Sequence, residues 1–343
     1  MREFKGFKKG VNLGGWLSQC GEGNYTKERF DTFITEKDIE KIAGWGTDHV
    51  RLPVDFHLFQ NEDGSFIESG FGYIDRCIEW CGKYNLNTVL DLHKTIGYIF
   101  DDKNYCRFFT DESLQDNFVR VWEEFTRRYG KYSERVAFEL LNEITAKETA
   151  QTWNRIAERT VKAIRRMNQD VRIILGGIYN SSIYGLQLLD KPYDENIVFT
   201  FHSYSPMIFT HQSAYWVENM PADLSVAYPE NLQTLRRKSQ DVFGSDFDRE
   251  FGNADAPIDS AFFGRLFAEA VAVSEKYNVP LYCGEYGVID KADPESTLRW
   301  FEDIHAAFEK YDIARAVWTY KEKDFGISGK HYNSIAERLV KLL

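Results

Sequence analysis

The chain has 343 residues, of which 43% are hydrophobic, and its formal net charge is −11. This apolar content is sufficient for a large core, so neither disulfides nor a structural metal is needed for folding. The acidic balance argues against a nucleic-acid-binding or membrane-binding protein, because both surfaces attract clustered lysine and arginine. On the same ground we expect a soluble monomer.

The cysteines and the first residues of the chain set two smaller expectations. Cys77 and Cys81 lie four residues apart in a helical pattern, without the second pair that a zinc site needs, so we expect buried thiols. Residues 1–6 lack the apolar core of a signal peptide. We therefore expect either a cytoplasmic protein or one whose leader has been removed.

Eight apolar runs alternate with helical patterns along the chain. Each run is continuous rather than alternating, as a parallel strand buried on both faces requires. Eight such strands with right-handed crossovers predict one α/β domain, residues 1–343, folded as a (β/α)8 TIM barrel. The expected strands are Phe7–Leu17, His49–Asp55, Asn87–His93, Val136–Glu143, Val171–Ile178, Ile197–Tyr204, Val279–Gly287 and Ala314–Tyr320.

Apolar residues at three-to-four spacing predict helices in most of the intervals between these strands. The segment Thr35–Trp45 opens with a weaker form of the capping box, because Asp38 follows Thr35 by three residues. The other helices are expected at Trp153–Met167, Phe262–Tyr277, Thr297–Tyr311 and Ser334–Leu343, around Phe118–Phe125 and Tyr73–Cys81, and weakly at Tyr184–Leu189, with Gly46, Gly130 and Asn278 as left-handed caps.

One connection is unusually long, since residues 206–259 join the sixth strand to the sixth helix. Loops of this length usually carry function. We expect an inserted subdomain that lies over the barrel mouth and lines a substrate cleft. Its aromatic and imidazole side chains include His211 and Trp216, which we expect to contact the substrate.

Polar and aromatic residues gather at the carboxyl ends of the predicted strands. In a barrel these ends meet at one mouth, where catalytic residues lie. The set is more polar and more aromatic than strand ends chosen at random. In chain order it contains Trp16, Arg51, His93, Asn142, Glu143, Asn180, His202, Tyr204, Glu285 and Trp318.

Glu143 and Glu285 are the candidate acid/base and nucleophile. Glu143 ends an apolar strand, where partial desolvation is expected to raise its pKa and suit it to general acid catalysis. Arg51 and Tyr204 are expected to donate hydrogen bonds to Glu285 and to hold it ionised. Two carboxyls in different environments divide these roles, and in a retaining glycosidase they stand ~5 Å apart.

Other assignments compete for several of these residues. Glu139 shares a strand face with Glu143, but both cannot reach the mouth, so we place Glu139 in the barrel interior or in an ion pair. His93 and His202 lack the His-x-His spacing of metal-dependent barrels, so we expect no metal and assign both to hydrogen bonding. Trp318 is expected to form a stacking floor for a sugar ring rather than part of the core.

Together these motifs resemble glycoside hydrolase family 5 over essentially the whole chain. The resemblance implies retention through a glycosyl-enzyme intermediate, a β-glucan substrate and no cofactor. It is carried by Gly10–Trp16, Arg51 in Arg-Leu-Pro, His93 in Asp-Leu-His, the pair Asn142 and Glu143, His202 and Tyr204 in His-Ser-Tyr, Glu285 in Gly-Glu-Tyr-Gly, and Trp318.

Within that family, Phe209–Gln212 and the insertion resemble the clostridial endoglucanase C branch, which implies hydrolysis of β-1,4 bonds in cellulose or mixed-linkage β-1,3-1,4-glucan. Lys94–Gly97 departs from the His-Ala-Pro-Gly usual in those relatives. The opening motif is also shared with exo-β-1,3-glucanases. An exo-β-1,3-glucanase, a β-mannanase and a non-catalytic carbohydrate-binding barrel are therefore the alternatives.

Overall fold

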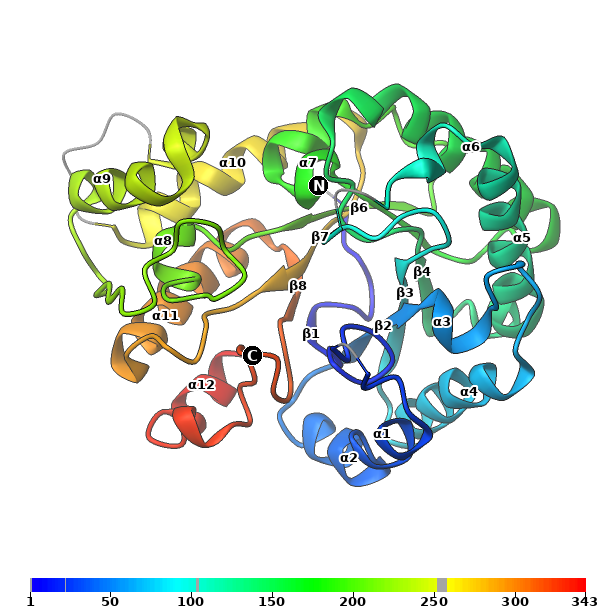
Figure 1. Ribbon diagram of the computed structural model, residues 1–343, viewed down its shortest axis with the longest axis horizontal. Helices are drawn as coiled ribbons and strands as arrows, with labels where there is room; N and C mark the ends of the chain where they lie inside the picture. Colours follow the sequence, from blue (N-terminus) through cyan, green and yellow to red (C-terminus); the bar gives the residue numbers. More distant parts are fainter. Residues whose placement is uncertain (1, 22, 103–104, 252–257) are drawn as a thin grey trace.

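A computed structural model describes residues 2–21, 23–102, 105–251 and 258–343. Within them, parallel strands close into a barrel in chain order, and helices surround it (Figure 1). The predicted TIM barrel is confirmed. Its eight strands are β1 (Lys9–Asn12), β2 (His49–Asp55), β3 (Asn87–Lys94), β4 (Val136–Glu139), β5 (Ile173–Gly176), β6 (Ile197–His202), β7 (Leu281–Tyr286) and β8 (Ala314–Val317).

The main predicted helices form, and the weakly expected one at Tyr184–Leu189 is a 3₁₀ segment, Ile183–Leu188. None of the described helices is long and apolar enough to cross a membrane. They are α1 (Lys27–Thr32), α2 (Glu36–Ala43), α3 (Phe56–Phe59), α4 (Glu68–Lys83), α5 (Glu112–Tyr129), α6 (Ala150–Met167), α7 (Ile178–Ser181), α8 (Met207–Thr210), α9 (Leu232–Phe243), α10 (Ser260–Tyr277), α11 (Pro294–Tyr311) and α12 (Ala336–Leu342). Of these, α1, α3, α7, α8 and α9 were not predicted.

Most of the expected helix ends are also observed. The Thr35–Asp38 capping box is present before α2, and Asn278 closes α10 in the left-handed conformation with a φ of 51°. Gly130 is a correction, because its φ of −56° is right-handed and leads from α5 into a 3₁₀ turn. Cys77 and Cys81 are buried free thiols in α4, as expected.

Several strands end earlier than predicted, most clearly β1 and β4. The run Phe7–Leu17 contributes only Lys9–Asn12 to the sheet, after which the chain turns through Gly15 at a φ of 82°. β4 ends at Glu139, so Glu143 lies in the loop that follows it. Alternation along a strand therefore does not fix the direction of these later side chains.

The barrel interior is apolar at the amino ends of the strands. There Phe4 and Phe7 stack with ring centroids 4.4 Å apart and pack with the inward side chains of six strands. These are Val89, Ala137, Ile174, Val198, Tyr282, Ala314 and Ala316, all buried. This apolar plug closes one end of the barrel, and polar residues fill the other.

The 206–259 insertion contains α8, α9 and a 3₁₀ segment, Gly244–Glu250. It packs against α11, where Tyr228 donates a 2.8 Å hydrogen bond to Asp303 and Arg299 donates one of 2.9 Å to the Tyr228 carbonyl. Residues Val226, Tyr228, Leu232 and Leu235 join the main hydrophobic core. The insertion is thus continuous with the barrel's packing. Its residues 252–257 lie outside the described part of the chain.

Candidate active site

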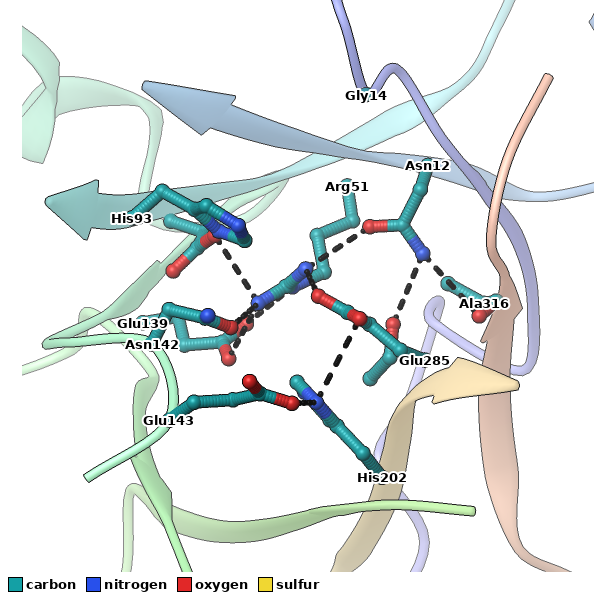
Figure 2. A network of polar contacts seen from close by, with 12 residues as sticks. Asn12, Gly14, Arg51, His93, Glu139, Asn142, Glu143, His202, Glu285 and Ala316 are labelled. Carbon is teal, nitrogen blue, oxygen red and sulfur yellow. Dashed lines mark hydrogen bonds and ion pairs between the residues drawn. The ribbon is translucent and has the colours of Figure 1, made fainter. Parts of the chain in front are cut away.

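Arg51 organises the polar end of the barrel. It extends from β2 and is completely buried, and it donates bidentate hydrogen bonds of 2.7 and 2.9 Å to Glu139. Its Nη1 donates to Glu285 at 2.7 Å, and its Nη2 lies 3.0 Å from Asp91 (Figure 2). Although burial opposes its charge, these three carboxylates raise the pKa of Arg51. A permanently charged guanidinium therefore sits beneath the site.

Two further residues hold this guanidinium in place. Asn12 accepts from Arg51 through its side-chain oxygen and donates a 2.9 Å hydrogen bond to the carbonyl of Gly284, which ties β1 to β2 and β7. Asn142 also accepts from Arg51, at 2.9 Å, while its own Nδ2 is buried without a partner among the described residues. The amide of Asn142 is therefore free to donate to a ligand.

Glu285 lies on β7 and receives two hydrogen bonds. Arg51 donates one at 2.7 Å, and the hydroxyl of Tyr204 donates the other at 2.8 Å. The register of β7 against both neighbouring strands shifts next to Glu285, and such irregularities re-aim a side chain. Both predicted donors are thus in contact with this carboxylate.

Glu143 follows β4 with a φ of 41°, a conformation that is strained for a residue with a side chain. The hydroxyl of Tyr98 stabilises it by donating a 2.6 Å hydrogen bond to the Glu143 carbonyl. The side chain is 17% exposed. Burial raises the pKa of Glu143 to about 8, and the charge of Arg51 offsets this only in part. Burial therefore favours the neutral form of this carboxyl.

His202 lies between the two carboxyls, as Figure 2 shows. Its Nδ1 shares a 2.8 Å hydrogen bond with Glu143 and is 3.6 Å from Glu285. One oxygen of each carboxyl and one ring nitrogen all lie within 4.8 Å of one another. Burial lowers the pKa of His202 to about 4, so the ring is neutral at pH 7. Glu139 is absent from this trio because its carboxyl pairs with Arg51 below, as expected.

His93 and Trp318 form an aromatic wall of the site. Their rings are stacked, with centroids 5.8 Å apart and planes 6° apart. His93 shares a 2.6 Å hydrogen bond with Asp91, and burial lowers its pKa to about 4. Gly14 packs directly against Trp318, since a Cβ there would lie 2.7 Å from the indole. This contact explains why position 14 of the opening motif is a glycine.

Trp16 is not at the mouth, which corrects the prediction that it lies there and is available to the substrate. Its side chain is 0% exposed, stacks on Trp80 at 6.2 Å, and donates its indole N–H to the carbonyl of Phe30 at 2.9 Å. The prediction extended β1 to Leu17, whereas the strand ends at Asn12. The turn after Asn12 directs the indole into the core.

Two adjacent cavities open at this end of the barrel. The first, of about 350 Å³, is lined by His93, Glu143, Tyr204, His211, Trp216, Glu285 and Trp318, among others. The second, of about 560 Å³, shares Glu143, Tyr204 and His211 with the first, but it lacks Glu285 and Trp318. We call it the second pocket. His211 and Trp216 bring the insertion to the cleft, with ring centroids 6.3 Å apart.

Asp91, Tyr98 and Asn12 are site residues that the sequence reasoning missed. Asp91 stands two residues before His93 on the same strand, so alternation places both on one face, and this signal was available. Asn12 carried a similar signal as the last residue of β1. Tyr98 carried none, because it acts from a loop on a main-chain carbonyl.

Comparison with known proteins agrees with this geometry. The family model "Cellulase (glycosyl hydrolase family 5)" matches residues 8–324. The chain is 41% identical to Endoglucanase C of Acetivibrio thermocellus over 98% of both chains, and 41% identical to Cellodextrinase A of Ruminococcus flavefaciens over 92% of this chain and 86% of that protein.

Solved structures give the same result. Thermotoga maritima Cel5A in complex with mannotriose is similar with a TM-score of 0.75 and 25% identity, over 98% of this chain and 97% of that one. The cellulose synthase subunit Z of Clostridioides difficile is similar with a TM-score of 0.76 and 25% identity, over 98% and 99%. This chain is a glycoside hydrolase and belongs to the cellulase family, glycosyl hydrolase family 5.

Proposed function

We propose that the protein is a retaining endo-β-1,4-glucanase that cleaves cellulose or mixed-linkage β-1,3-1,4-glucan by double displacement. The observation that carries this proposal is the close approach of Glu143 and Glu285, whose nearest oxygens are within 4.8 Å. Retaining glycosidases hold their two carboxyls about 5 Å apart, whereas inverting enzymes need a wider gap for water.

Glu285 is the nucleophile in this proposal. Arg51 and Tyr204 donate to its two different oxygens, which fixes the carboxylate and supports its negative charge. It attacks the anomeric carbon and forms a covalent glycosyl-enzyme, and water later releases the sugar.

Glu143 is the acid/base. Its raised pKa keeps a proton available for the departing glycosidic oxygen, and the carboxylate that remains then accepts a proton from the attacking water. The hydrogen bond with His202 fixes the direction of this carboxyl. The two carboxyls thus carry out complementary steps from one small volume.

The remaining residues bind the sugar. The free amide of Asn142 is positioned to donate to the 2-hydroxyl, where a hydrogen bond strengthens as the oxocarbenium ion develops. Trp318 offers its ring face to the apolar C–H face of the pyranose, and His93 and His202 donate to hydroxyls. His211 and Trp216 extend this surface along the inserted subdomain.

The relatives support the choice of substrate. The names Endoglucanase C and Cellodextrinase A indicate action on glucan and on cellodextrin, and both proteins match this chain over nearly its full length. We therefore expect carboxymethylcellulose and lichenan to be cut faster than laminarin or mannan.

Product stereochemistry tests the proposal directly. ¹H NMR during the first minutes of cellopentaose hydrolysis is expected to show the β-anomer forming first. Glu143→Gln and Glu285→Gln are expected to lose activity while Glu275→Gln, which changes an exposed carboxyl on α10, retains it. First release of the α-anomer, or wild-type rates in Glu285→Gln, would contradict the mechanism.

A further inference from the structure

The cavity of the second pocket has no assigned role in the proposed double displacement. It contains Glu143 but not Glu285. Because the acid protonates the leaving-group oxygen while the nucleophile attacks the anomeric carbon, a cavity with only the acid lies on the leaving-group side of the cut bond. The sugar that departs first is therefore the one that enters this pocket.

Two segments far apart in sequence form its walls. The loop after β5 supplies Tyr179 and Tyr184, and the insertion supplies Arg249 and Glu250. The guanidinium of Arg249 lies 4.0 Å from the centre of the Tyr184 ring, which joins the two walls. The pocket thus depends on the insertion as well as on the barrel.

The loop after β5 is strained where it meets the pocket. Three consecutive residues, Tyr179, Asn180 and Ser181, have φ values of 64°, 56° and 50°. Such conformations cost free energy in residues with a side chain and cluster at functional sites. Here they place Tyr179 and Asn180 on the pocket wall, with Lys147 held 3.9 Å from the Tyr179 ring centre.

Glu250 is an unusual residue for such a wall. Its side chain is only 8% exposed, and its Oε1 has no hydrogen-bond partner among the described residues. Burial raises the pKa of Glu250 to about 8, although Ser205 and the backbone N–H of Met207 act in the opposite direction. A buried polar atom without a partner is costly, so a ligand that satisfies it explains why it is kept.

We infer that Glu250 binds a hydroxyl of the leaving-group sugar and is a specificity-determining residue for oligosaccharide substrates. A carboxyl both donates to and accepts from sugar hydroxyls, and a site built for such a bond discriminates against leaving groups that lack it. This inference rests on the proposed glucanase function. The competing role is purely structural, with Glu250 only joining the 3₁₀ segment to the start of α8.

Two substrates with different leaving groups separate these roles. Cellopentaose places a sugar in the second pocket, whereas 4-nitrophenyl β-cellobioside places an aryl group without hydroxyls there. Glu250→Met keeps the side-chain size but removes both oxygens. We expect it to lower kcat/KM for cellopentaose roughly tenfold, the effect of one lost hydrogen bond, and to change the aryl substrate less than about twofold.

Glu250→Gln restores hydrogen bonding and is expected to recover most of the cellopentaose activity. Tyr228→Phe is the matched control, because it removes a buried anchor of the insertion that lines neither cavity. It is expected to affect both substrates equally. Equal losses on both substrates in Glu250→Met, or no loss on either, would overturn the inference. Failure of the wild-type protein on both substrates would instead refute the proposed function.

Discussion

The surroundings of Glu285 and Glu143 differ sharply, although the nearest oxygens of the two carboxyls are within 4.8 Å. Glu285 accepts from a buried guanidinium and from the hydroxyl of Tyr204. Glu143 shares its hydrogen bond with a neutral imidazole, and burial dominates its pKa. One glutamate thus contacts a fixed cation directly, whereas the other does not. This division is what a double displacement requires.

Removal of the Arg51 guanidinium is expected to have the largest effect on the difference between Glu285 and Glu143. In Arg51→Lys, one ammonium replaces a planar fork that contacts Glu139, Glu285 and Asp91 at once. We expect kcat to fall by roughly 10³ and stability by about 3 kcal/mol, because buried carboxylates lose their partner. Urea unfolding and steady-state kinetics measure both, and unchanged kcat would contradict the assigned role.

Tyr204→Phe also removes a contact of Glu285, and its expected effect is smaller. One donor to Glu285 is lost while Arg51 still donates, so kcat/KM is expected to fall by about 10- to 100-fold. Since Tyr204 donates to the nucleophile and not to Glu143, the fall should extend to aryl substrates that need little acid assistance. An effect confined to substrates with poor leaving groups would instead indicate that Tyr204 assists the acid, Glu143.

Trp318→Ala and Trp16→Phe compare an indole at the mouth with one in the core. Loss of Trp318 is expected to reduce kcat/KM roughly tenfold, because a stacking surface is removed, and to cost about 3 kcal/mol of stability, because the indole is only 8% exposed and packs in a hydrophobic cluster. Trp16→Phe is expected to cost about 2 kcal/mol of stability and leave KM unchanged. Kinetics and thermal melting of both variants test these expectations, and a raised KM in Trp16→Phe would indicate that Trp16 contacts the substrate after all.

The pH dependence of stability tests the environment of Glu143. Because its folded pKa is raised from 4.5 to about 8, the folded state holds a proton that the unfolded state releases. Stability therefore falls as pH rises through this window and is fully present below it. Glu143→Gln removes this penalty, so its melting temperature should exceed that of the wild type at about pH 8 and match it near pH 4.5. Equal melting temperatures at both pH values would show that burial does not raise this pKa.

Sequence reasoning located the barrel and most of the site for one physical reason. Parallel strands deliver the residues at their carboxyl ends to one edge, so His93, His202 and Glu285 follow from strand positions. Arg51 is only the third residue of β2 and contacts Glu285 through its long side chain. The prediction for Trp16 was wrong because this residue lies beyond the end of β1, where a turn and not strand alternation sets the direction of its side chain.

The other features of the site that the sequence did not predict depend on loop geometry. The left-handed conformation of Glu143 depends on Tyr98, which belongs to a different loop. Likewise, the second pocket exists because the insertion brings Glu250 beside the strained loop after β5. Such contacts join distant segments and leave no periodic pattern in the sequence.

Rescue by azide tests the division of roles most directly. With 4-nitrophenyl β-cellobioside, Glu143→Ala still forms the glycosyl-enzyme, and azide then attacks to give the β-glycosyl azide. Glu285→Ala cannot form that intermediate, so azide displaces the aryl group directly and gives the α-glycosyl azide. We predict this opposite pair of products by ¹H NMR. The same anomer from both variants, or the two anomers exchanged, would contradict the assignment of Glu285 as nucleophile and Glu143 as acid/base.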